Sequence, residues 1–526
     1  MRKAALFLLI SLFLYSGVSL YCRPERGEVY QAQALGVDFL ISGLTSEEIR
    51  NLSLSYHLYS PDGKMFKFEN PRFRPEGRKF RLRVFFPIPG DYIVEFELLK
   101  EGGFWGRDRG WRPCKFRLRV LPLFSRGFRE KYLNFFIPFR EESFRKIQYL
   151  IRITYKNNEI WKGGRFFGFS AGSSYPQVWI RDMASAVEYA LKFYPIKDLE
   201  RSVENFLLFQ HSDGEVFGWI SPDYRLGKNS ISSDQESSLV LASLPLARKD
   251  PSWLCRKIRG KRVIDRLQEA LLWVWRERRE KTGLIWSGFK ADWGDLYPFR
   301  SSDPNHLHSG DLRVVGVYTQ ARFFRALRAL EEMEGYCKPR IRIPLRAMAK
   351  EIRENSRRFL YLQREGYFLI HRVLGHPEYL PLERGIFALG GNAEAALAGF
   401  FTREEFSLLL RVQRGRMHRL SLFSPSFVLL PPYPQGFFKF HLMKPWHYQN
   451  GGGWDWIGAR MAAAAVKYGF RSRAREYLRE MCRRNLRWMS VYEWFDREGR
   501  GKGAYFYTAA AGEMARALIL LARAPR

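Results

Sequence analysis

The chain has 526 residues, of which 46% are hydrophobic and 16% aromatic. This is enough apolar surface for a large core and excludes disorder as the dominant state. Its 87 Lys and Arg residues outnumber 54 Asp and Glu residues, for a formal net charge of +33. Such a balance is typical of proteins that bind nucleic acid, anionic lipid or acidic polymers, so the role of the charge is the first question.

Residues 1–22 have the pattern of a secretory signal peptide. Two basic residues precede an apolar run from Ala4 to Tyr15, and small residues follow it. The run is short for a membrane span, so an uncleaved anchor is the lesser alternative. A lipid anchor at Cys22 is disfavoured because the preceding Tyr21 is bulky. We expect a secreted or periplasmic protein that binds no nucleic acid.

The remaining cysteines are scattered without CxxC spacing and predict neither a zinc site nor a disulfide scaffold. They are Cys114, Cys255, Cys337 and Cys482. No Asp-rich loop requires calcium. We therefore expect no metal and no cofactor.

Residues 23–125 are predicted to form an all-β sandwich. Apolar and polar residues alternate over 80–86, 92–98 and 116–120, as in half-buried strands. Turn tripeptides at 61–63 and 89–91 separate the strands.

Residues 130–526 show helical periodicity and are predicted to form one large domain, a ring of helical hairpins. The inner helices should consist of small, apolar residues, as in segments 461–466 and 509–511, and the outer helices should be rich in basic and polar residues. The predicted helices are 141–155, 181–194, 198–210, 234–247, 261–279, 313–334, 341–362, 384–400, 402–412, 454–468, 471–488 and 504–523.

An aromatic run before an Arg-Asp pair is the first candidate site. Trp179 precedes Arg181 and Asp182 at a predicted helix start. A guanidinium and a carboxylate can hold vicinal sugar hydroxyls while an aromatic face packs on the ring. The alternative is a capped helix start with a local ion pair.

A second candidate is the loop 286–295, which holds Asp292 and Asp295 beside Trp286 and Trp293. A carboxyl group next to indole rings is desolvated, and a raised pKa suits a proton donor near neutral pH. The alternative is a turn with exposed acidic side chains.

Three further segments carry candidate substrate-binding residues. Glu493 lies among aromatic residues, where a carboxylate with no task is costly, and an ion pair with an arginine is its alternative. A glycine-rich aromatic loop spans 446–456. The segment 233–238 is either a capped helix start or part of the same rim. The residues in question are Tyr448, Asn450, Trp454, Tyr492, Asp234 and Glu236.

Taken together, these motifs resemble the six-hairpin (α/α)6-barrel glycosidases, including glucoamylases, processing α-glucosidases, neutral invertases and debranching amylo-α-1,6-glucosidases. The resemblance covers about residues 130–526. It rests on Trp179–Asp182, on Tyr448–Gly452 and on Tyr492-Glu493, in the order that the family shows. It implies an all-α (α/α)6 toroid and inverting hydrolysis of a glycosidic bond, with an α-glucoside of an oligo- or polysaccharide as the expected substrate.

The resemblance implies that Asp292 protonates the leaving oxygen and that Glu493 activates a water. Asp295 competes with Asp292 for the role of the acid, and we favour Asp292. Asp455 stands where a neutral residue is expected, and either adjusts the sugar subsite or pairs with an arginine.

Two other functions compete with hydrolysis. A glycoside phosphorylase would use bound phosphate in place of the base, and the presence of Glu493 argues against it. A non-catalytic protein could instead hold a glycan or an anionic cell-envelope surface. Arginines recur every four residues from Arg471 to Arg487, which indicates either a solvated helix face or a docking stripe. The sequence does not predict the oligomeric state.

Overall fold

The computed structural model describes residues 19–24, 28–30, 34–42, 52–59, 72–73, 79–85, 90–100, 103–104, 114–121, 137 and 139–524. The chain divides into two compact units, residues 1–131 and 132–526. Most of the predicted signal peptide and the predicted turn at 61–63 lie outside the described residues.

The first unit is built from two sheets. A three-stranded sheet has the order β1-β3-β6, and a larger sheet has the order β2-β9-β7-β4-β5, with β8 paired to β7. Phe39 of β3 and Phe96 of β7 are buried, and their rings meet edge to face at 4.8 Å. The strands are β1 Ser19–Pro24, β2 Glu28–Tyr30, β3 Ala34–Ser42, β4 Leu52–Tyr59, β5 Arg72–Phe73, β6 Lys79–Phe85, β7 Gly90–Lys100, β8 Gly103–Phe104 and β9 Cys114–Leu121.

Strand pairing among the described strands of this unit is mostly antiparallel. In the antiparallel pair β4–β7, Tyr56 is the register partner of Phe96, and β2 pairs with β9 in parallel. The strands predicted at 92–98 and 116–120 lie within β7 and β9. Residues 80–85 of the strand predicted at 80–86 lie within β6, and Phe86 is outside the described residues. β1 begins at Ser19, so a boundary after residue 22 would cut through a strand that pairs with β3.

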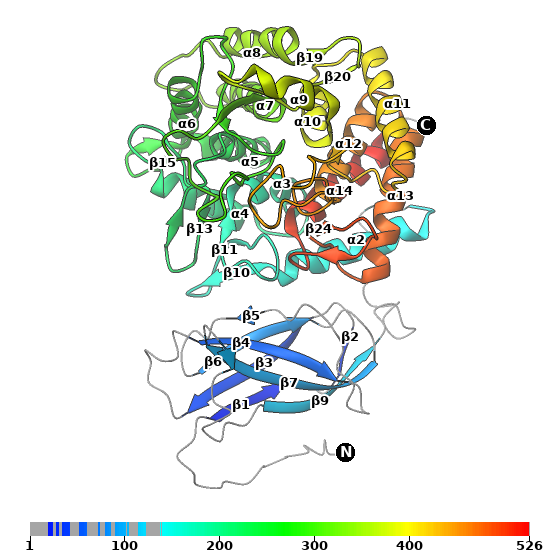
Figure 1. Cartoon of the computed structure of the whole chain (residues 1–526). Helices are drawn as coiled ribbons and strands as arrows, with labels where there is room; N and C mark the ends of the chain where they lie inside the picture. Colours follow the sequence, from blue (N-terminus) through cyan, green and yellow to red (C-terminus); the bar gives the residue numbers. More distant parts are fainter. Residues whose placement is uncertain are drawn as a thin grey trace. The chain divides into compact units, whose positions relative to one another are not determined.

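In the second unit, six helices form a closed ring. α3 contacts α5, and the contacts continue through α7, α10 and α12 to α14, which returns to α3 (Figure 1). The other six long helices alternate with them along the chain, which is the arrangement of a ring of helical hairpins. The ring helices are α3 Ile180–Ala190, α5 Gln235–Lys249, α7 Val317–Glu334, α10 Leu389–Ala398, α12 Asp455–Lys467 and α14 Thr508–Arg523.

The alternating helices lie outside this ring in Figure 1. They are α2 Glu142–Asn157, α4 Ile196–Phe209, α6 Val263–Glu277, α8 Leu345–Leu360, α11 Arg403–Arg419 and α13 Arg471–Trp488; the short helices η3 Pro251–Cys255, η4 Pro377–Tyr379 and α9 Leu380–Gly385 lie in connections. Each of the twelve predicted helices corresponds to one of these long helices. The end predicted at 412 is wrong, because α11 continues to Arg419.

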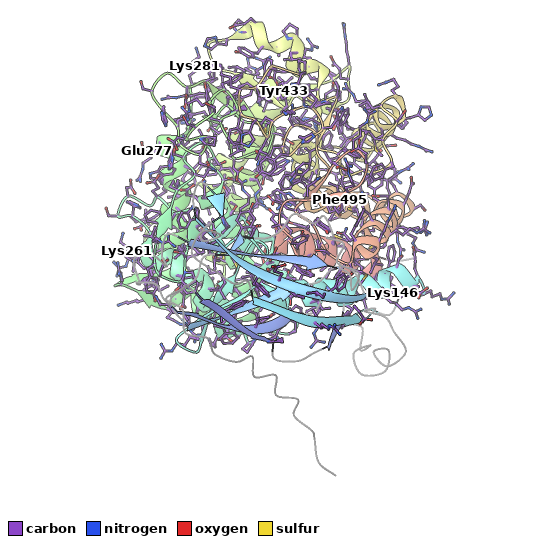
Figure 2. All side chains as sticks on the ribbon, turned by 60° about the horizontal axis from the view of Figure 1, so that its bottom comes forward. Lys146, Lys261, Glu277, Lys281, Tyr433 and Phe495 are labelled. Carbon is purple, nitrogen blue, oxygen red and sulfur yellow. A yellow bond between two sulfur atoms is a disulfide. The ribbon has the colours of Figure 1, made fainter. Side chains whose placement is uncertain are left out.

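Burial separates inner from outer helices. α12 is buried without interruption from Asp455 to Ala465, as expected for a helix enclosed on all sides. Outer α13 buries only one stripe, which includes Ala474, Tyr477 and Leu478. In Figure 2 the charged side chains of outer elements project from the periphery, whereas Tyr433 lies inside and is fully buried.

Short strand pairs link the helices at the ends of the ring. They place loop residues in fixed register; for example, Trp179 pairs with Trp219. The strands are β10 Glu159–Lys162, β11 Arg165–Phe169, β12 Val178–Trp179, β13 Trp219–Ile220, β14 Leu226–Gly227, β15 Lys257–Ile258, β16 Lys261–Arg262, β17 Ser287–Gly288, β18 Arg313–Gly316, β19 Tyr361–Leu362, β20 Tyr367–Phe368, β21 His371–Val373, β22 Phe387–Ala388, β23 Leu429–Leu430, β24 Trp494–Phe495 and β25 Gly501–Lys502.

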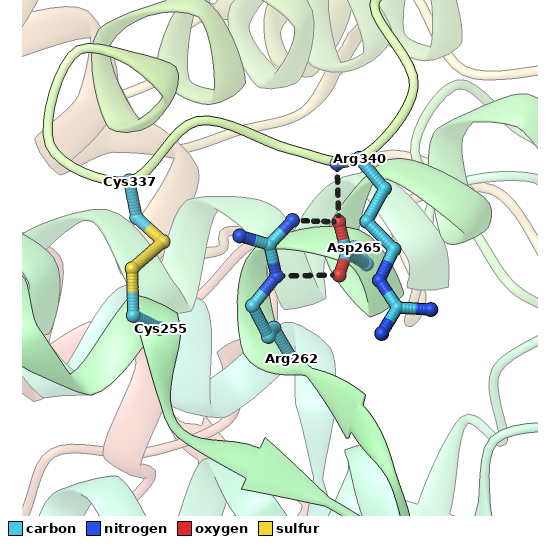
Figure 3. The surroundings of a disulfide bond; sticks show 5 residues. All are labelled: Cys255, Arg262, Asp265, Cys337 and Arg340. Atoms are coloured by element: carbon cyan, nitrogen blue, oxygen red, sulfur yellow. Dashed lines mark hydrogen bonds and ion pairs between the residues drawn. A yellow bond between two sulfur atoms is a disulfide. The ribbon is translucent and has the colours of Figure 1, made fainter.

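Cys255 and Cys337 form a disulfide across 82 residues of sequence, which the cysteine spacing did not predict (Figure 3). Nearby, Asp265 accepts hydrogen bonds from the Arg262 guanidinium at 2.8 and 2.9 Å and from the Arg340 amide at 2.9 Å. The disulfide joins the segment after α5 to the segment after α7. The spacing rule fails here because the fold, not the sequence, brings the two cysteines together.

Candidate active site

The N-terminal ends of four of the ring helices, α3, α5, α12 and α14, contribute to the lining of a cavity of about 290 Å³. Arg181 and Asp182 lie in the first turn of α3, and Trp454 and Tyr507 immediately precede α12 and α14. Loops supply the rest. The polar and aromatic lining consists of Tyr175, Trp179, Arg181, Asp182, Asn229, Gln235, Trp293, Asp295, Asn305, Tyr448, Gln449, Trp454, Trp456, Glu493 and Tyr507.

Arg181 and Gln449 hold Asp295 at the cavity wall. Gln449 Nε2 donates to Asp295 Oδ1 at 2.5 Å, and the Asp295 amide donates to Gln449 Oε1 at 3.2 Å. Arg181 Nη1 lies 3.8 Å from Asp295 Oδ2, while its Nη2 donates to Asp234 Oδ1 at 2.9 Å. The Asp295 carboxyl group is therefore fixed by two partners and still reaches the cavity.

Glu493 is held on the cavity wall by one side chain and one amide. Tyr175 Oη donates to Oε1 at 3.0 Å, and the Ala504 amide donates to Oε2 at 2.9 Å. Burial raises the pKa of Glu493 to about 7, although both hydrogen bonds lower it. Gly503 has a φ of +69°, and a side chain there would collide with the Glu493 carboxylate, so both conformation and space require glycine.

Asp182 is the third carboxylate of the cavity. Burial raises its pKa to about 7, and the Arg181 guanidinium partly opposes that effect. Among the described residues, its Oδ1 atom is buried without a hydrogen-bond partner. A buried acceptor of this kind costs free energy unless a ligand supplies a donor.

Other buried polar atoms of the cavity lining also lack a partner within the described part of the chain. They include the indole nitrogens of Trp179, Trp293 and Trp456 and the amide oxygens of Asn229 and Gln235. These are three donors and two acceptors, beside the Asp182 acceptor. A hydroxyl group both donates and accepts, so this mixture matches a polyhydroxylated ligand.

Aromatic rings support the same wall of the cavity. Trp293 packs edge to face on Trp454 and Trp456, with centroids 4.6 and 4.9 Å apart. The ring centroids of Tyr448 and Trp454 are 5.3 Å apart, and the indole nitrogen of Trp454 donates a hydrogen bond to the Tyr448 carbonyl at 2.8 Å. Such a wall can pack on the apolar face of a sugar ring.

Asp292, our favoured acid, is not among the residues that line this cavity. Both of its carboxylate oxygens accept from the Gly391 amide, at 2.9 and 3.0 Å. Burial raises its pKa to about 7. Burial also lowers the pKa of neighbouring Lys290 to about 8. The raised pKa that the sequence predicted is present, but Asp292 is enclosed behind the wall, whereas Asp295 faces the cavity.

Five predicted substrate-binding residues lie outside the cavity lining. Asp234 is fully buried and interacts with Arg181. Burial raises the pKa of Asp234, but the positive charges of Arg181 and Lys290 outweigh this effect and lower the pKa to about 2. Glu236 accepts from Lys228. Trp286 lies between the guanidinium groups of Arg278 and Arg313. The other two are Asn450 and Tyr492.

Asn450 has a structural role: it donates to the carbonyls of Tyr433 and Met443 and accepts from the Tyr433 amide. Asp455 is buried and pairs with Arg484, so of the two expectations for this residue the ion pair is correct. In both cases the polar side chain bonds to other buried groups inside the ring of helices. The sequence shows residue type but not which way the side chain faces.

Four residues that line the cavity were not among the predicted site residues: Asn229, Gln235, Asn305 and Tyr507. Asn229 and Asn305 each donate to the Asp295 carbonyl, at 2.6 and 3.4 Å. Tyr507 immediately precedes a ring helix, in the same position as Trp179 and Trp454. That shared position is the signal that could have identified it.

Within the described ranges, no group of three His, Cys, Asp or Glu side chains is arranged to hold a metal ion. The helices in those ranges also include none with the length and hydropathy of a membrane span.

No family model and no curated protein matches the sequence. Solved structures do match the fold. The GH63 mannosylglycerate hydrolase of Thermus thermophilus, in complex with glucose, aligns with 71% of this chain and 99% of its own, at a TM-score of 0.51 and 16% identity. A rhamnosidase from Klebsiella oxytoca with rhamnose bound aligns with 92% of this chain and 87% of its own, at a TM-score of 0.51 and 11% identity.

The chain thus has the fold of the (α/α)6-barrel glycosidases. The resemblance drawn from three short motifs is confirmed at the level of architecture. At this identity the likeness carries the fold, and the chemistry is argued from the cavity itself.

Proposed function

We propose that this protein is a glycoside hydrolase that cleaves a glycosidic bond in the cavity at the N-terminal ends of the ring helices. The observation that carries the proposal is the cavity itself, where three carboxylates and unpaired donors and acceptors of the described residues meet an aromatic wall. Solved structures of the same fold contain glucose and rhamnose, which supports a sugar as the ligand.

In this proposal Asp295 is the general acid and Glu493 the general base. Asp295 protonates the leaving oxygen, and Glu493 removes a proton from the attacking water. Support for Asp295 over Asp292 comes from position, because of these two only Asp295 lines the cavity. Gln449 and Arg181 orient its carboxyl group.

Arg181 and Asp182 hold hydroxyl groups of the sugar, and the tryptophans pack against the ring. Arg181 is the one cation among the described lining residues and is already paired with Asp234. A neutral sugar therefore fits this subsite better than a uronic acid. We retain an α-glucoside as the proposed substrate and inversion as the proposed outcome.

The test is a panel of α- and β-linked disaccharides and oligosaccharides, with the released sugar and its anomeric configuration followed by NMR. We expect release of a monosaccharide from an α-glucoside, with the β-anomer formed first. Asp295→Asn and Glu493→Gln should each lower kcat by about 10³-fold or more. Asp223→Asn, at an exposed residue outside the cavity, is the control.

Retention of full activity by Asp295→Asn together with inactivity of Asp292→Asn would return the acid role to Asp292. Sugar release that requires inorganic phosphate would indicate a phosphorylase. Glycan binding without release from any member of the panel would indicate a binding protein.

We also propose that the protein is exported and that its N-terminal sheets form a β-sandwich. The disulfide between Cys255 and Cys337 supports export, because such bonds persist in oxidising compartments. The contact between Phe39 and Phe96 supports the sandwich. Mass spectrometry of the mature protein from the culture medium or periplasm tests export.

A further inference from the structure

A second, larger cavity of about 420 Å³ lies toward the C-terminal ends of the ring helices. Lys467, the last residue of α12, and Arg248, near the end of α5, belong to its lining. None of its lining residues lines the first cavity, which is proposed above to bind a sugar and is called the sugar cavity below. The two cavities are therefore separate sites.

Cations outnumber carboxylates in this second cavity. The lining includes Arg248, Arg322, Arg325, Arg328, Lys467 and Arg516 but only three glutamates among its described residues. Helix C-termini attract cations, which accounts for Lys467 and Arg248. It does not account for Arg322 and Arg325 in the middle of α7, or for Arg516 in the middle of α14, because the effect falls off within the last turn.

The buried carboxylates beneath the cavity are already shared. Glu394 is paired with Arg322, Arg325 and Arg460, and Glu513 is paired with Arg460 and Arg516. Two carboxylates thus serve four guanidinium groups. Glu188, 3.6 Å from Arg516, is more than half exposed and adds little.

Two cations remain incompletely satisfied among the described residues. Arg322 is 2% exposed, and its Nε atom has no hydrogen-bond partner. Lys467 donates to the Leu397 carbonyl at 2.8 Å and has no carboxylate partner in the described part of the chain. Burial, followed by repulsion from Arg325 and Arg516, lowers the pKa of Lys467.

We propose that this cavity binds a small phosphate-bearing anion. Guanidinium groups pair with phosphate oxygens through parallel hydrogen bonds, and a dianion would offset the excess positive charge. The volume exceeds that of a single phosphate group, so a diphosphate or a phosphorylated small molecule fits better than orthophosphate. The proposal does not depend on the glycosidase activity.

The test is isothermal titration of the full-length protein with inorganic pyrophosphate and with orthophosphate at constant ionic strength. We expect saturable binding of one pyrophosphate per chain, tighter than orthophosphate. Lys467→Met combined with Arg516→Gln should weaken pyrophosphate binding by about 10-fold or more. Arg475→Gln combined with Arg483→Gln removes the same charge from the exposed face of α13. This control should change the affinity for pyrophosphate by less than about 2-fold.

Lys467→Arg keeps the positive charge and should still bind pyrophosphate. This variant therefore distinguishes loss of a binding group from loss of the folded structure. Absence of saturable binding up to about 10 mM pyrophosphate would overturn the proposal. Equal weakening in the α13 control would overturn it too, because diffuse surface charge would then explain the binding.

Discussion

Glu493 links the structure of the cavity to the pH range in which the proposed hydrolase should work. A general base must be unprotonated, and burial raises the pKa of this carboxyl group to about 7. We therefore expect kcat/KM to fall as the pH drops below about 7. A pH–rate profile measures this limb, and a limb near the ordinary carboxyl pKa of about 4 would contradict the assignment.

The hydrogen bond from Tyr175 provides a way to distinguish the titration of Glu493 from that of Asp182, whose pKa is also about 7. That bond lowers the pKa of Glu493. Tyr175→Phe should therefore move the acidic limb up by about half a pH unit. If the acidic limb of the pH–rate profile does not move in this variant, a group other than Glu493 is responsible for it.

Gln449 is a positioning residue for the proposed acid. Its side-chain amide makes two hydrogen bonds to Asp295, one to the carboxylate and one from the backbone amide. Gln449→Met should lower kcat by about 10²-fold with little change in KM, because the acid loses its orientation while the sugar contacts remain. Gln449→Glu, which can still accept from the Asp295 amide, is the comparison. Full activity of Gln449→Met would show that the two hydrogen bonds are dispensable.

Asp292 contributes to stability in a pH-dependent way. Its folded-state pKa of about 7 lies above the ordinary value, so the stability it contributes is fully present below about pH 4 and is lost as the pH rises through 7. From about pH 6 to pH 8 the wild type should lose about 1 kcal/mol of unfolding free energy relative to Asp292→Asn. Urea unfolding at both pH values measures the difference, and parallel stability curves would contradict it.

At the scale of elements, the ring helices are tied together by buried charge. Arg460 of α12 is fully buried, pairs with Glu394 of α10 and Glu513 of α14, and stacks on Trp456 at 4.3 Å. The same α12 and α14 present Trp454 and Tyr507 to the sugar cavity at their N-terminal ends. The ion pairs thus fix neighbouring elements that shape the site.

Removal of this arginine should be costly. Arg460→Met leaves two buried carboxylates with fewer partners, and we expect a loss of about 3 kcal/mol in the free energy of unfolding. Arg475→Met, at an exposed position of α13, is the matched control and should change stability by less than about 0.5 kcal/mol. Chemical denaturation of both variants gives the comparison, and equal stabilities would show that the network is dispensable.

At the scale of the whole molecule, the net charge of +33 is not the feature that builds the sugar cavity. The described lining of that cavity has three carboxylates and one arginine. Many cations of the outer helices are paired with nearby carboxylates, as Arg479 of α13 is with Glu141, which precedes α2, at 2.6 Å. Some of the remaining positive charge converges on the second cavity, where it forms the proposed anion site.

The disulfide constrains the unfolded chain over 82 residues. In the chain-entropy account, loss of a cross-link that closes a loop of this length should lower stability by about 4.5 kcal/mol. We expect Cys255→Ser combined with Cys337→Ser to reduce the melting temperature markedly, and a reductant to do the same to the wild type. Calorimetry with and without reductant tests this, and a reductant without effect would contradict the bond.

Periodicity and motif order in the sequence determined much of this protein. Twelve helical segments were visible because alternating inner and outer helices bury their residues in different patterns, continuous in α12 and striped in α13. Arg181, Asp182 and Glu493 were identified from their aromatic surroundings, and the structure places all three at the cavity.

Tertiary structure alone decided which side chains face the cavity. Asp292 and Asp295 are three residues apart with similar neighbours, yet the first turns to the Gly391 amide and the second to the cavity. Cys255 and Cys337 meet only because the segments after α5 and α7 come together. Local sequence sets the burial and period of an element, but loop direction and contacts between distant segments depend on how the whole ring closes.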